Sequence, residues 1–478
     1  MTSTFQEAEN DRAASGLKYY CDLDLTPDGR LLLMARFIRL FSYGWLSMGL
    51  VVYLLEIGLT QFEIGLLFMA TMMGDLIITF ILTTTADSVG RRMTLLVGSA
   101  LKIFAGVVFA MQSNLAVLIL AGIIGIISPS GSEIGPFLAC EQSALTETIT
   151  RPEKIPIIFG WFQALAYGAQ ALGALCSGMA LYSLQHGHDW SALSAYRFII
   201  VMYGCYGILM FAVYFFLSPS IEPLTTRALT GPRDWFTKFG LHRSESKKMV
   251  AKLSSLFILD AFAGGFVIQS FIVYWFHESW SMEPDHIGTL ILCANLLAGV
   301  SAILATPLVG KIGAINTMVV THFPSNIFLL LVPFMPTATS AAVVLLLRFT
   351  ISQMDVPARQ TYVATMVDAD ERSAAGGITN VVRSIGLSLS PILAGFLLAD
   401  PSNHIRFALP FILAGGLKCL YDVLLYVSFR AHEAGAVEDQ GGKTVSYTRV
   451  GVDAAEVTQQ HSQVPDTNLY DEDALETK

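Results

Sequence analysis

The stretch Asp87-Ser88-Val89-Gly90-Arg91-Arg92 lies between two long apolar runs of the chain. These runs extend from Phe62 to Thr85 and from Met93 to Met111, and each is long enough to cross a bilayer as a helix. A loop this short forces the two helices into an antiparallel hairpin. The arginine pair places the loop on the cytoplasmic side, because Lys and Arg accumulate in cytoplasmic loops beside membrane helices.

The composition is that of a chain surrounded mainly by lipid. Hydrophobic residues make up 53% of the sequence and charged residues 14%, and the mean hydropathy is +0.57. The net charge of −9 comes from the tails, because residues 1–30 hold six acidic and three basic groups and residues 431–478 hold ten and three. The body between them is left with about +1, so the acidic balance does not identify a partner. The polar start of the chain does not resemble a cleaved signal peptide.

Twelve apolar runs reach the length of a membrane-spanning helix. The loops predicted to be external lack Lys and Arg, so both termini are predicted to be cytoplasmic. The runs are Leu32–Leu55, Phe62–Thr85, Met93–Met111, Leu115–Ala139, Ile155–Tyr182, Tyr196–Leu217, Leu253–Phe276, Ile287–Val309, Ile315–Phe334, Ala338–Val356, Ala374–Ala399 and Ile405–Phe429.

A basic segment between the sixth and seventh runs divides the chain into two halves. We predict a cytoplasmic tail over residues 1–30, a six-helix bundle over 31–217, a cytoplasmic linker over 218–252, a second six-helix bundle over 253–430 and an acidic tail over 431–478. The last segment has the composition of a disordered region.

The two halves repeat one another at a constant spacing of 221 residues. A single offset that relates residues in the first and seventh runs and in the loops after the fourth and tenth runs is hard to obtain by chance. It predicts two pseudo-symmetric bundles. The related pairs are Arg39 and Asp260, Gly44 and Gly265, Tyr53 and Tyr274, Pro136 and Pro357, Glu147 and Asp368, and Arg151 and Arg372.

The stretch from Thr83 to Arg92 resembles the loop between spans 2 and 3 of the major facilitator superfamily, G-x-x-x-D-x-x-G-R-R, with Thr83 in place of the leading glycine. Strings that begin at Ser128 (SPSGSEIGPF), Thr321 (THFPSN) and Gln353 (QMDVPARQ) resemble a poorly characterised bacterial and fungal branch. The resemblance implies an all-α membrane protein with twelve transmembrane helices in two six-helix bundles and a substrate site between them near the midplane. It also implies a conformational motif formed by Asp87, Gly90, Arg91 and Arg92.

Charged side chains deep in a membrane are costly and are therefore candidates for function. From a rise of about 1.5 Å per residue, Asp75 lies about 16 Å and Lys102 about 14 Å from the loop that joins their helices. One interpretation is a proton-coupling carboxylate controlled by Lys102. The alternative is a structural ion pair between neighbouring helices.

Arg39 and Asp260 form a second predicted pair, because spans 1 and 7 face each other across the cavity in this architecture. The pair is interpreted either as a gate between the two halves or as a permanent bridge. Asp260 would be held ionised by an opposite charge within about 4–6 Å.

Further polar residues are candidates for substrate binding or gating. Arg348 and Arg383 lie near mid-depth, Glu133 lies between two prolines, and Gln269 and Asn295 suit an amide-lined pocket. The deep cations outnumber the deep acids, which favours an anionic or zwitterionic substrate. The alternative for each cation is a contact between helices.

These features predict a secondary transporter that moves a small solute by alternating access, with proton coupling as a further hypothesis. A sensor or receptor that kept the transporter fold without transport is the alternative. The absence of HExxH and of a converging Ser, His and Asp set argues against an enzyme. No cofactor, metal or nucleic acid is expected as a partner. We expect a monomer in a lipid bilayer, in the plasma membrane or the vacuolar membrane.

Overall fold

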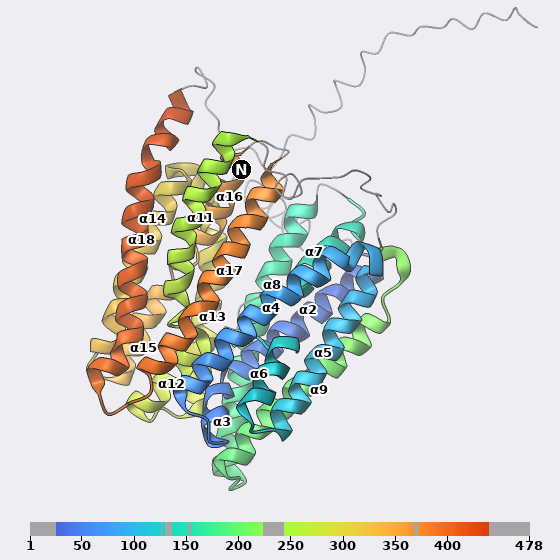
Figure 1. Cartoon of the computed structure of the whole chain (residues 1–478), viewed down its shortest axis with the longest axis vertical. Helices are drawn as coiled ribbons and strands as arrows, with labels where there is room; N and C mark the ends of the chain where they lie inside the picture. Colours follow the sequence, from blue (N-terminus) through green and yellow to red (C-terminus); the bar gives the residue numbers. More distant parts are fainter. Residues whose placement is uncertain are drawn as a thin grey trace, which may run out of the picture. The chain divides into compact units, whose positions relative to one another are not determined.

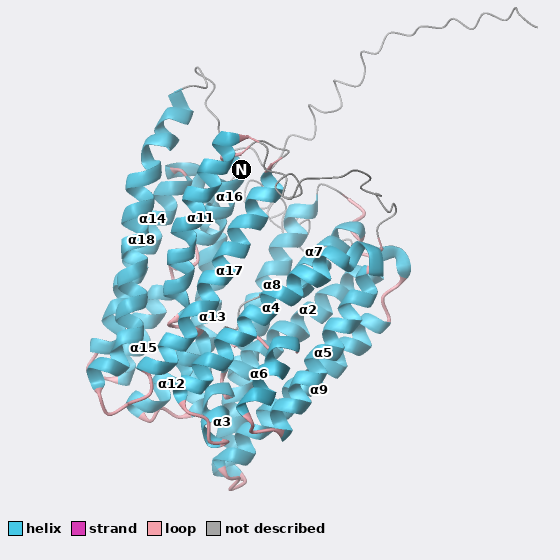
Figure 2. Ribbon diagram, viewed as in Figure 1, coloured by secondary structure: helices cyan, strands magenta, loops and turns pink. Residues whose placement is uncertain are grey.

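The computed structural model describes residues 25–125, 127–129, 136–151, 154–222, 243–367 and 371–438. Within these ranges the regular structure is helical (Figure 2), apart from one isolated bridge between Leu25 and Ile149. The helical body forms one compact unit within Met1–Arg430 (Figure 1).

Eight helices form the first half of the body, called the N-terminal bundle below. They are α2 (Pro27–Ser47), α3 (Leu50–Glu56), α4 (Gln61–Val89), α5 (Arg91–Met111), α6 (Leu115–Ile124), α7 (Pro136–Glu147), α8 (Ile155–Tyr182) and α9 (Ala192–Phe215).

Eight further helices form the second half, called the C-terminal bundle below. They are α11 (Ser244–Gly265), α12 (Gln269–Trp280), α13 (Pro284–Ile312), α14 (Ala314–Leu331), α15 (Ala338–Phe349), α16 (Asp355–Thr365), α17 (Arg372–Leu397) and α18 (His404–Glu438).

The helices account for the twelve predicted spans, although not every span is one continuous helix. Over the described ranges, nine helical segments are long and apolar enough to cross a membrane, or ten with the bent pair α2 and α3. The fourth and tenth predicted spans correspond to two shorter helices each, α6 with α7 and α15 with α16. The sequence prediction missed these interruptions, because hydropathy records apolar length and not helical continuity.

The first and seventh spans are interrupted at equivalent places. The axis bends by 47° between α2 and α3, after Ser47, and α11 ends at Gly265 before α12 begins at Gln269. Gly44 and Gly265 lie close to each break, and a Cβ atom on either would collide with the backbone of the neighbouring helix, α8 or α17. The predicted repeat is therefore present in the packing.

The two bundles meet along α4 against α17 and along α8 against α13. Small residues permit this close approach: Gly65 on α4 faces Gly395 on α17, and Gly178 on α8 faces Gly288 on α13. Glycine lets helix backbones pack closely in a membrane, where van der Waals contact supplies much of the association energy.

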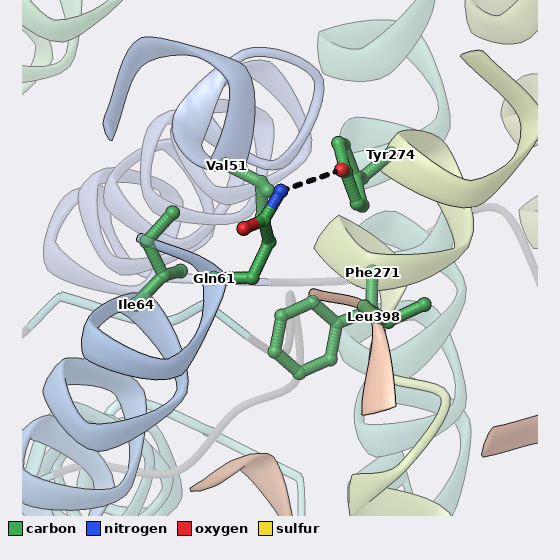
Figure 3. A pocket seen from close by; sticks show the side chains of 6 residues that line it. All are labelled: Val51, Gln61, Ile64, Phe271, Tyr274 and Leu398. Atoms are coloured by element: carbon green, nitrogen blue, oxygen red, sulfur yellow. Dashed lines mark hydrogen bonds between the residues drawn. The ribbon is translucent and has the colours of Figure 1, made fainter. Parts of the chain in front are cut away.

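We name the two ends of the bundles after the glycines in their first two loops, Gly58 and Gly90. At the Gly58 end, α12 joins the two bundles. Gln61 Nε2 donates to the Tyr274 hydroxyl at 3.1 Å (Figure 3), and the rings of Phe68 and Phe271 lie 5.4 Å apart. The Gly58 end is therefore closed by contacts between the bundles.

Candidate functional site

A buried carboxylate, Glu141 on α7, organises the polar centre of the N-terminal bundle. Arg39 on α2 donates to Glu141 Oε2, the Tyr214 hydroxyl on α9 donates to Oε1 at 2.6 Å, and Arg36 Nη1 lies 3.9 Å from Oε2. The side chains of Glu141 and Arg36 are fully buried. Glu141 and Arg36 were not among the predicted site residues, although the spacing of Arg36 and Arg39 puts two cations on one face of α2.

The predicted ion pair between Asp75 and Lys102 is not formed. Lys102 Nζ donates to Ser42 Oγ and lies 4.7 Å and 4.3 Å from the ring centroids of Tyr43 and Tyr203. Lys102 therefore faces α2 and α9 instead of α4. Asp75 is 3% exposed, and its Oδ1 has no hydrogen-bond partner among the residues with described side chains.

The glycine–arginine motif is held inside the N-terminal bundle. Gly90 has a φ of 100° and precedes α5. The carboxylate of Glu222 accepts hydrogen bonds from the backbone N–H groups of Arg91 at 2.7 Å and Arg92 at 3.0 Å, which suits a helix N-terminus. Arg91 Nη1 also donates to the Ile221 carbonyl at 3.1 Å. The side chain of Asp87 lies outside the described part.

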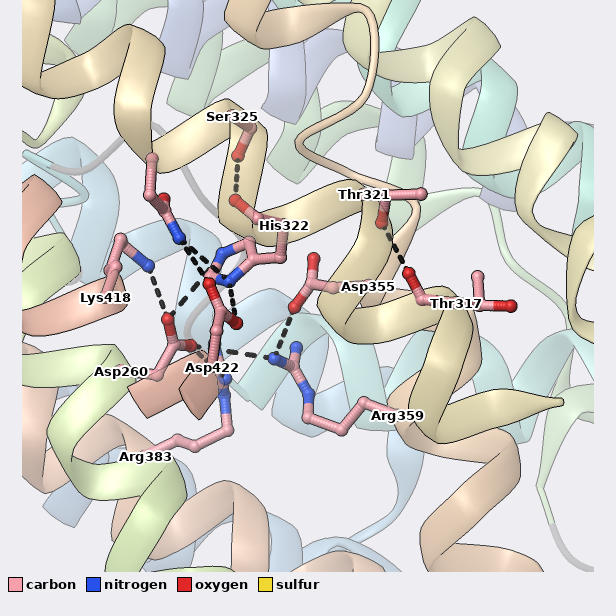
Figure 4. Close-up of polar contacts among 11 residues, drawn as sticks. Asp260, Thr317, Thr321, His322, Ser325, Asp355, Arg359, Arg383, Lys418 and Asp422 are labelled. Atoms are coloured by element: carbon pink, nitrogen blue, oxygen red, sulfur yellow. Dashed lines mark hydrogen bonds and ion pairs between the residues drawn. The ribbon is translucent and has the colours of Figure 1, made fainter. Parts of the chain in front are cut away.

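A second buried carboxylate, Asp260 on α11, is the centre of the C-terminal bundle (Figure 4). Asp260 Oδ1 lies 2.5 Å from Lys418 Nζ on α18. Asp260 Oδ2 lies 3.0 Å from Arg383 Nη1 on α17 and 3.7 Å from Arg359 Nη1 on α16. Arg359 also bonds Asp355 at 2.9 Å. One carboxylate thus joins three cations from three helices.

His322 on α14 extends this cluster to a third carboxylate. Its Nδ1 lies 2.9 Å from Asp422 Oδ1 on α18, and its Nε2 lies 3.8 Å from Asp260 Oδ1. Asn326 Nδ2 donates to Asp422 Oδ2 at 2.9 Å. Arg383 on α17 could be identified from the sequence, but the link that His322 forms between the two carboxylates could not, because it depends on which helices are neighbours.

The predicted pairing of Arg39 with Asp260 is wrong in this structure. Arg39 is bonded to Glu141 and Asp260 to Lys418 and Arg383, so each has partners in its own bundle. The repeat offset correctly identified equivalent positions. It did not show that each position faces the interior of its own bundle.

A cavity of about 260 Å³ opens beside the Asp260 cluster. The guanidinium groups of Arg359 and Arg383 contribute positive charge to its wall, and the side chain of Arg383 is 27% exposed. Gln360, Thr379 and Asn380 provide neutral polar groups. A cavity with two guanidiniums and several amide or hydroxyl groups can bind a small anion by charge-assisted hydrogen bonds.

The other predicted residues fall in different places. Gln269 lies between the bundles: its Nε2 donates to Ser47 Oγ at 2.6 Å, and its Oε1 accepts from Gln170 at 3.0 Å and from Asn295 at 3.4 Å. Arg348 is buried at the end of α15, in electrostatic range of the C-terminal cluster. Glu133 lies outside the described residues.

Comparison with known proteins supports the family. The model of the Major Facilitator Superfamily matches residues 32–354 and 253–459. An uncharacterised membrane protein of Saccharomyces cerevisiae is 27% identical over 430 residues, which cover 85% of this chain and 95% of the yeast protein. The crystal structure of the nucleoside transporter NupG has a TM-score of 0.63 at 15% identity and covers 85% of this chain and 99% of its own. A D-xylose-proton symporter structure has a TM-score of 0.62 at 14% identity and covers 83% and 97%. The chain is a multi-pass membrane protein that belongs to the major facilitator superfamily.

Proposed function

We propose that this protein is a secondary transporter that moves a small anionic or zwitterionic solute by alternating access. The observation that carries the proposal is the cavity lined by Arg359 and Arg383. The guanidinium of Arg383 is only partly neutralised there, because it shares the single carboxylate of Asp260 with Lys418 and Arg359.

The charge of the whole C-terminal cluster agrees with an anionic solute. Its cations are Lys418, Arg383, Arg359 and Arg348, and its carboxylates are Asp260, Asp355 and Asp422. Four cations and three carboxylates leave an excess of one positive charge when His322 is neutral. Excess charge is expensive in a low-dielectric interior, so a bound anion is stabilised there.

The conformation supports alternating access. The contacts of Gln61, Gln269 and Phe68 with the opposite bundle close the Gly58 end, whereas the cavity residues lie on the Gly90 side of α16 and α17. We place the Gly90 end in the cytoplasm because its loops carry the arginines and lysines. In that orientation the structure represents an inward-facing state.

We further propose that the protein works as a monomer in the plasma membrane or the vacuolar membrane, with residues 31–217 and 253–430 as its two moving bundles. The substrate is taken to be a small molecule, with protons as the coupling ion. Asp75 and the Asp260 cluster are the groups proposed to bind those protons.

Exchange in proteoliposomes tests the proposal. Radiolabelled lactate, succinate, glutamate, alanine and inorganic phosphate are compared with uridine and xylose, neutral solutes of the kinds named for the two structural neighbours. We expect exchange of an anion or a zwitterion. Arg383→Gln is expected to weaken its apparent affinity about 10- to 100-fold, the effect of losing one charged hydrogen bond.

Arg406→Gln is the matched control, because Arg406 bonds the Phe396 carbonyl at the Gly58 end of the same bundle. It should leave exchange unchanged. Exchange of a neutral solute alone, at a rate that Arg383→Gln does not alter, would refute the proposed substrate class. Absence of exchange for every solute would favour a sensor with a transporter fold.

A further inference from the structure

His322 lies between two buried carboxylates, Asp422 and Asp260. It is 4% exposed, with Nδ1 at 2.9 Å from Asp422 and Nε2 at 3.8 Å from Asp260. A protonated imidazole has an N–H for each carboxylate, whereas the neutral ring leaves one nitrogen lone pair facing a negative charge. Each ring nitrogen of His322 therefore faces a carboxylate oxygen.

The nearest acceptor to the ring, Asp422 Oδ1, identifies which nitrogen gains and loses the proton. Asn326 Nδ2 donates to Asp422 and lies 3.1 Å from His322 Nδ1. If Nδ1 carried no proton, its lone pair would face Asp422 Oδ1 at 2.9 Å. Nδ1–H donating to Asp422 avoids this repulsion, so the titrating nitrogen is Nε2, which faces Asp260.

A proton on Nε2 changes the balance of charge at Asp260. The carboxylate already receives Lys418 at 2.5 Å and Arg383 at 3.0 Å. Arg383 is the more exposed of these two cations and lines the cavity. It can therefore exchange Asp260 for a solute anion, while the buried Lys418 remains in place.

The charged and titratable groups around His322 come from five helices. They are Asp260 on α11, Arg348 on α15, Asp355 and Arg359 on α16, Arg383 on α17, and Lys418, Cys419, Tyr421 and Asp422 on α18. Protonation of His322 raises the net charge of this cluster by one unit, and a bound monovalent anion lowers it by one.

We propose that His322 Nε2 binds the coupling proton and that this proton and an anion at Arg383 favour each other's binding through Asp260. The proposal deepens the proposed function and rests on its anionic substrate class. Linkage is reciprocal, so a proton on His322 strengthens anion binding by the same factor by which the anion strengthens proton binding. Proton and anion then cross together, and both leave when the site reaches the opposite side.

Histidine titration tests this linkage without a known substrate. The protein is labelled with ¹⁵N-histidine, reconstituted in liposomes and titrated from about pH 5 to 9 by solid-state NMR. The resonance lost in His322→Gln identifies His322. Asn326→Ala, which keeps the histidine and alters its neighbour, shifts the same resonance and gives a second assignment if His322→Gln does not fold.

Arg383→Gln removes the positive charge that a bound anion would neutralise. We expect it to move the His322 midpoint upward by about one pH unit, a tenfold gain in proton affinity, whereas Arg406→Gln leaves the midpoint unchanged. A midpoint that Arg383→Gln does not move, or a His322 that does not titrate, overturns the linkage. Failure of every anion in the exchange assay would refute the substrate class while the titration still reports on His322, so the two failures are distinguishable.

Discussion

Arg39 and Asp260 occupy equivalent positions in the two repeats. Each contacts an oppositely charged residue on the fourth span of its own bundle. Arg39 on α2 bonds Glu141 on α7, and Asp260 on α11 lies 3.7 Å from Arg359 on α16. The first and fourth spans are thus joined in the same way as the seventh and tenth, with the charges exchanged. Among the ion pairs of the described residues, those of Arg39 and Asp260 lie within one bundle each, so they need not break when the bundles move.

Exchanging the charges of Arg39 and Glu141 should preserve the ion pair between α2 and α7. Arg39→Glu and Glu141→Arg each leave like charges buried together, and each should lower the free energy of unfolding by about 3–5 kcal/mol. The double variant should recover part of that loss. Arg39→Asp with Asp260→Arg should recover none, because the two new charges lie in different bundles and do not meet each other. Thermal unfolding of the purified protein in detergent measures the difference.

Glu147→Gln is the control for that series. Glu147 lies 3.5 Å from Arg91, but its side chain is 37% exposed, so the change should remain within about 1 kcal/mol. If Arg39→Asp with Asp260→Arg proved more stable than either single change, a direct pair between the bundles would have to exist.

Gln269 is expected to stabilise the closed Gly58 end. Its Nε2 donates to Ser47 Oγ at 2.6 Å across the bundle interface, and its Oε1 accepts from Gln170 at 3.0 Å. Gln269→Ala should shift the population away from the state with an open cavity by about 1–3 kcal/mol, since buried partners lose their bonds. Labelling of a cysteine placed at Asn380, a cavity residue, should slow accordingly.

Gln112→Ala, in an exposed loop at the same end, is the matched control and should not change the labelling rate. Equal rates in the two variants would show that the amide contacts of Gln269 do not bias the conformational equilibrium.

Gly90 and Gly58 allow backbone strain to be separated from the contact with Glu222. Their φ angles are 100° and 96°. A Cβ atom on Gly90 would lie 3.1 Å from Glu222 Oε1, whereas one on Gly58 would meet no atom within 4 Å. Gly58→Ala should cost about 1–2 kcal/mol for the left-handed conformation alone. Gly90→Ala should cost more, as measured by thermal unfolding. Equal costs would mean that the Glu222 carboxylate moves aside freely.

The fold could be predicted from the sequence because a helix must be long and apolar enough to cross the bilayer, and such runs can be recognised in the sequence. The repeat offset also identified equivalent sites: Gly44 and Gly265 both pack against a neighbouring helix near a break. The breaks themselves were missed, because α6 ends at Ile124 and α15 ends at Phe349, inside the predicted fourth and tenth spans, and hydropathy does not register where a helix ends.

The partners of the deep charges could not be predicted in the same way. Helical periodicity shows which residues share one face of a helix, but not which neighbour that face meets. Lys102 was assigned to Asp75 from depth alone, yet it faces Tyr43 and Tyr203. Lys418 and Asp422 are four residues apart on α18, and they bond Asp260 and His322 instead of each other.

Asp75 should be protonated in this conformation. It is 3% exposed, its Oδ1 has no hydrogen-bond partner within the described ranges, and a buried carboxylate without a cation is too costly to remain charged. Asp75→Asn should therefore change the free energy of unfolding by less than about 1 kcal/mol, because it replaces one neutral group by another. Asp260→Asn, which removes the counter-ion of Lys418 and Arg383, should cost about 3–5 kcal/mol.

The same variant tests whether Asp75 carries a coupling proton. If it does, Asp75→Asn should exchange an anion down its gradient at the normal rate but fail to accumulate it when a pH gradient is imposed, since the variant cannot release a proton on the opposite side. The comparison is made in proteoliposomes with the wild-type protein and His322→Gln. Normal accumulation by Asp75→Asn together with its loss in His322→Gln would assign proton coupling to the C-terminal bundle and leave Asp75 as a buried neutral group.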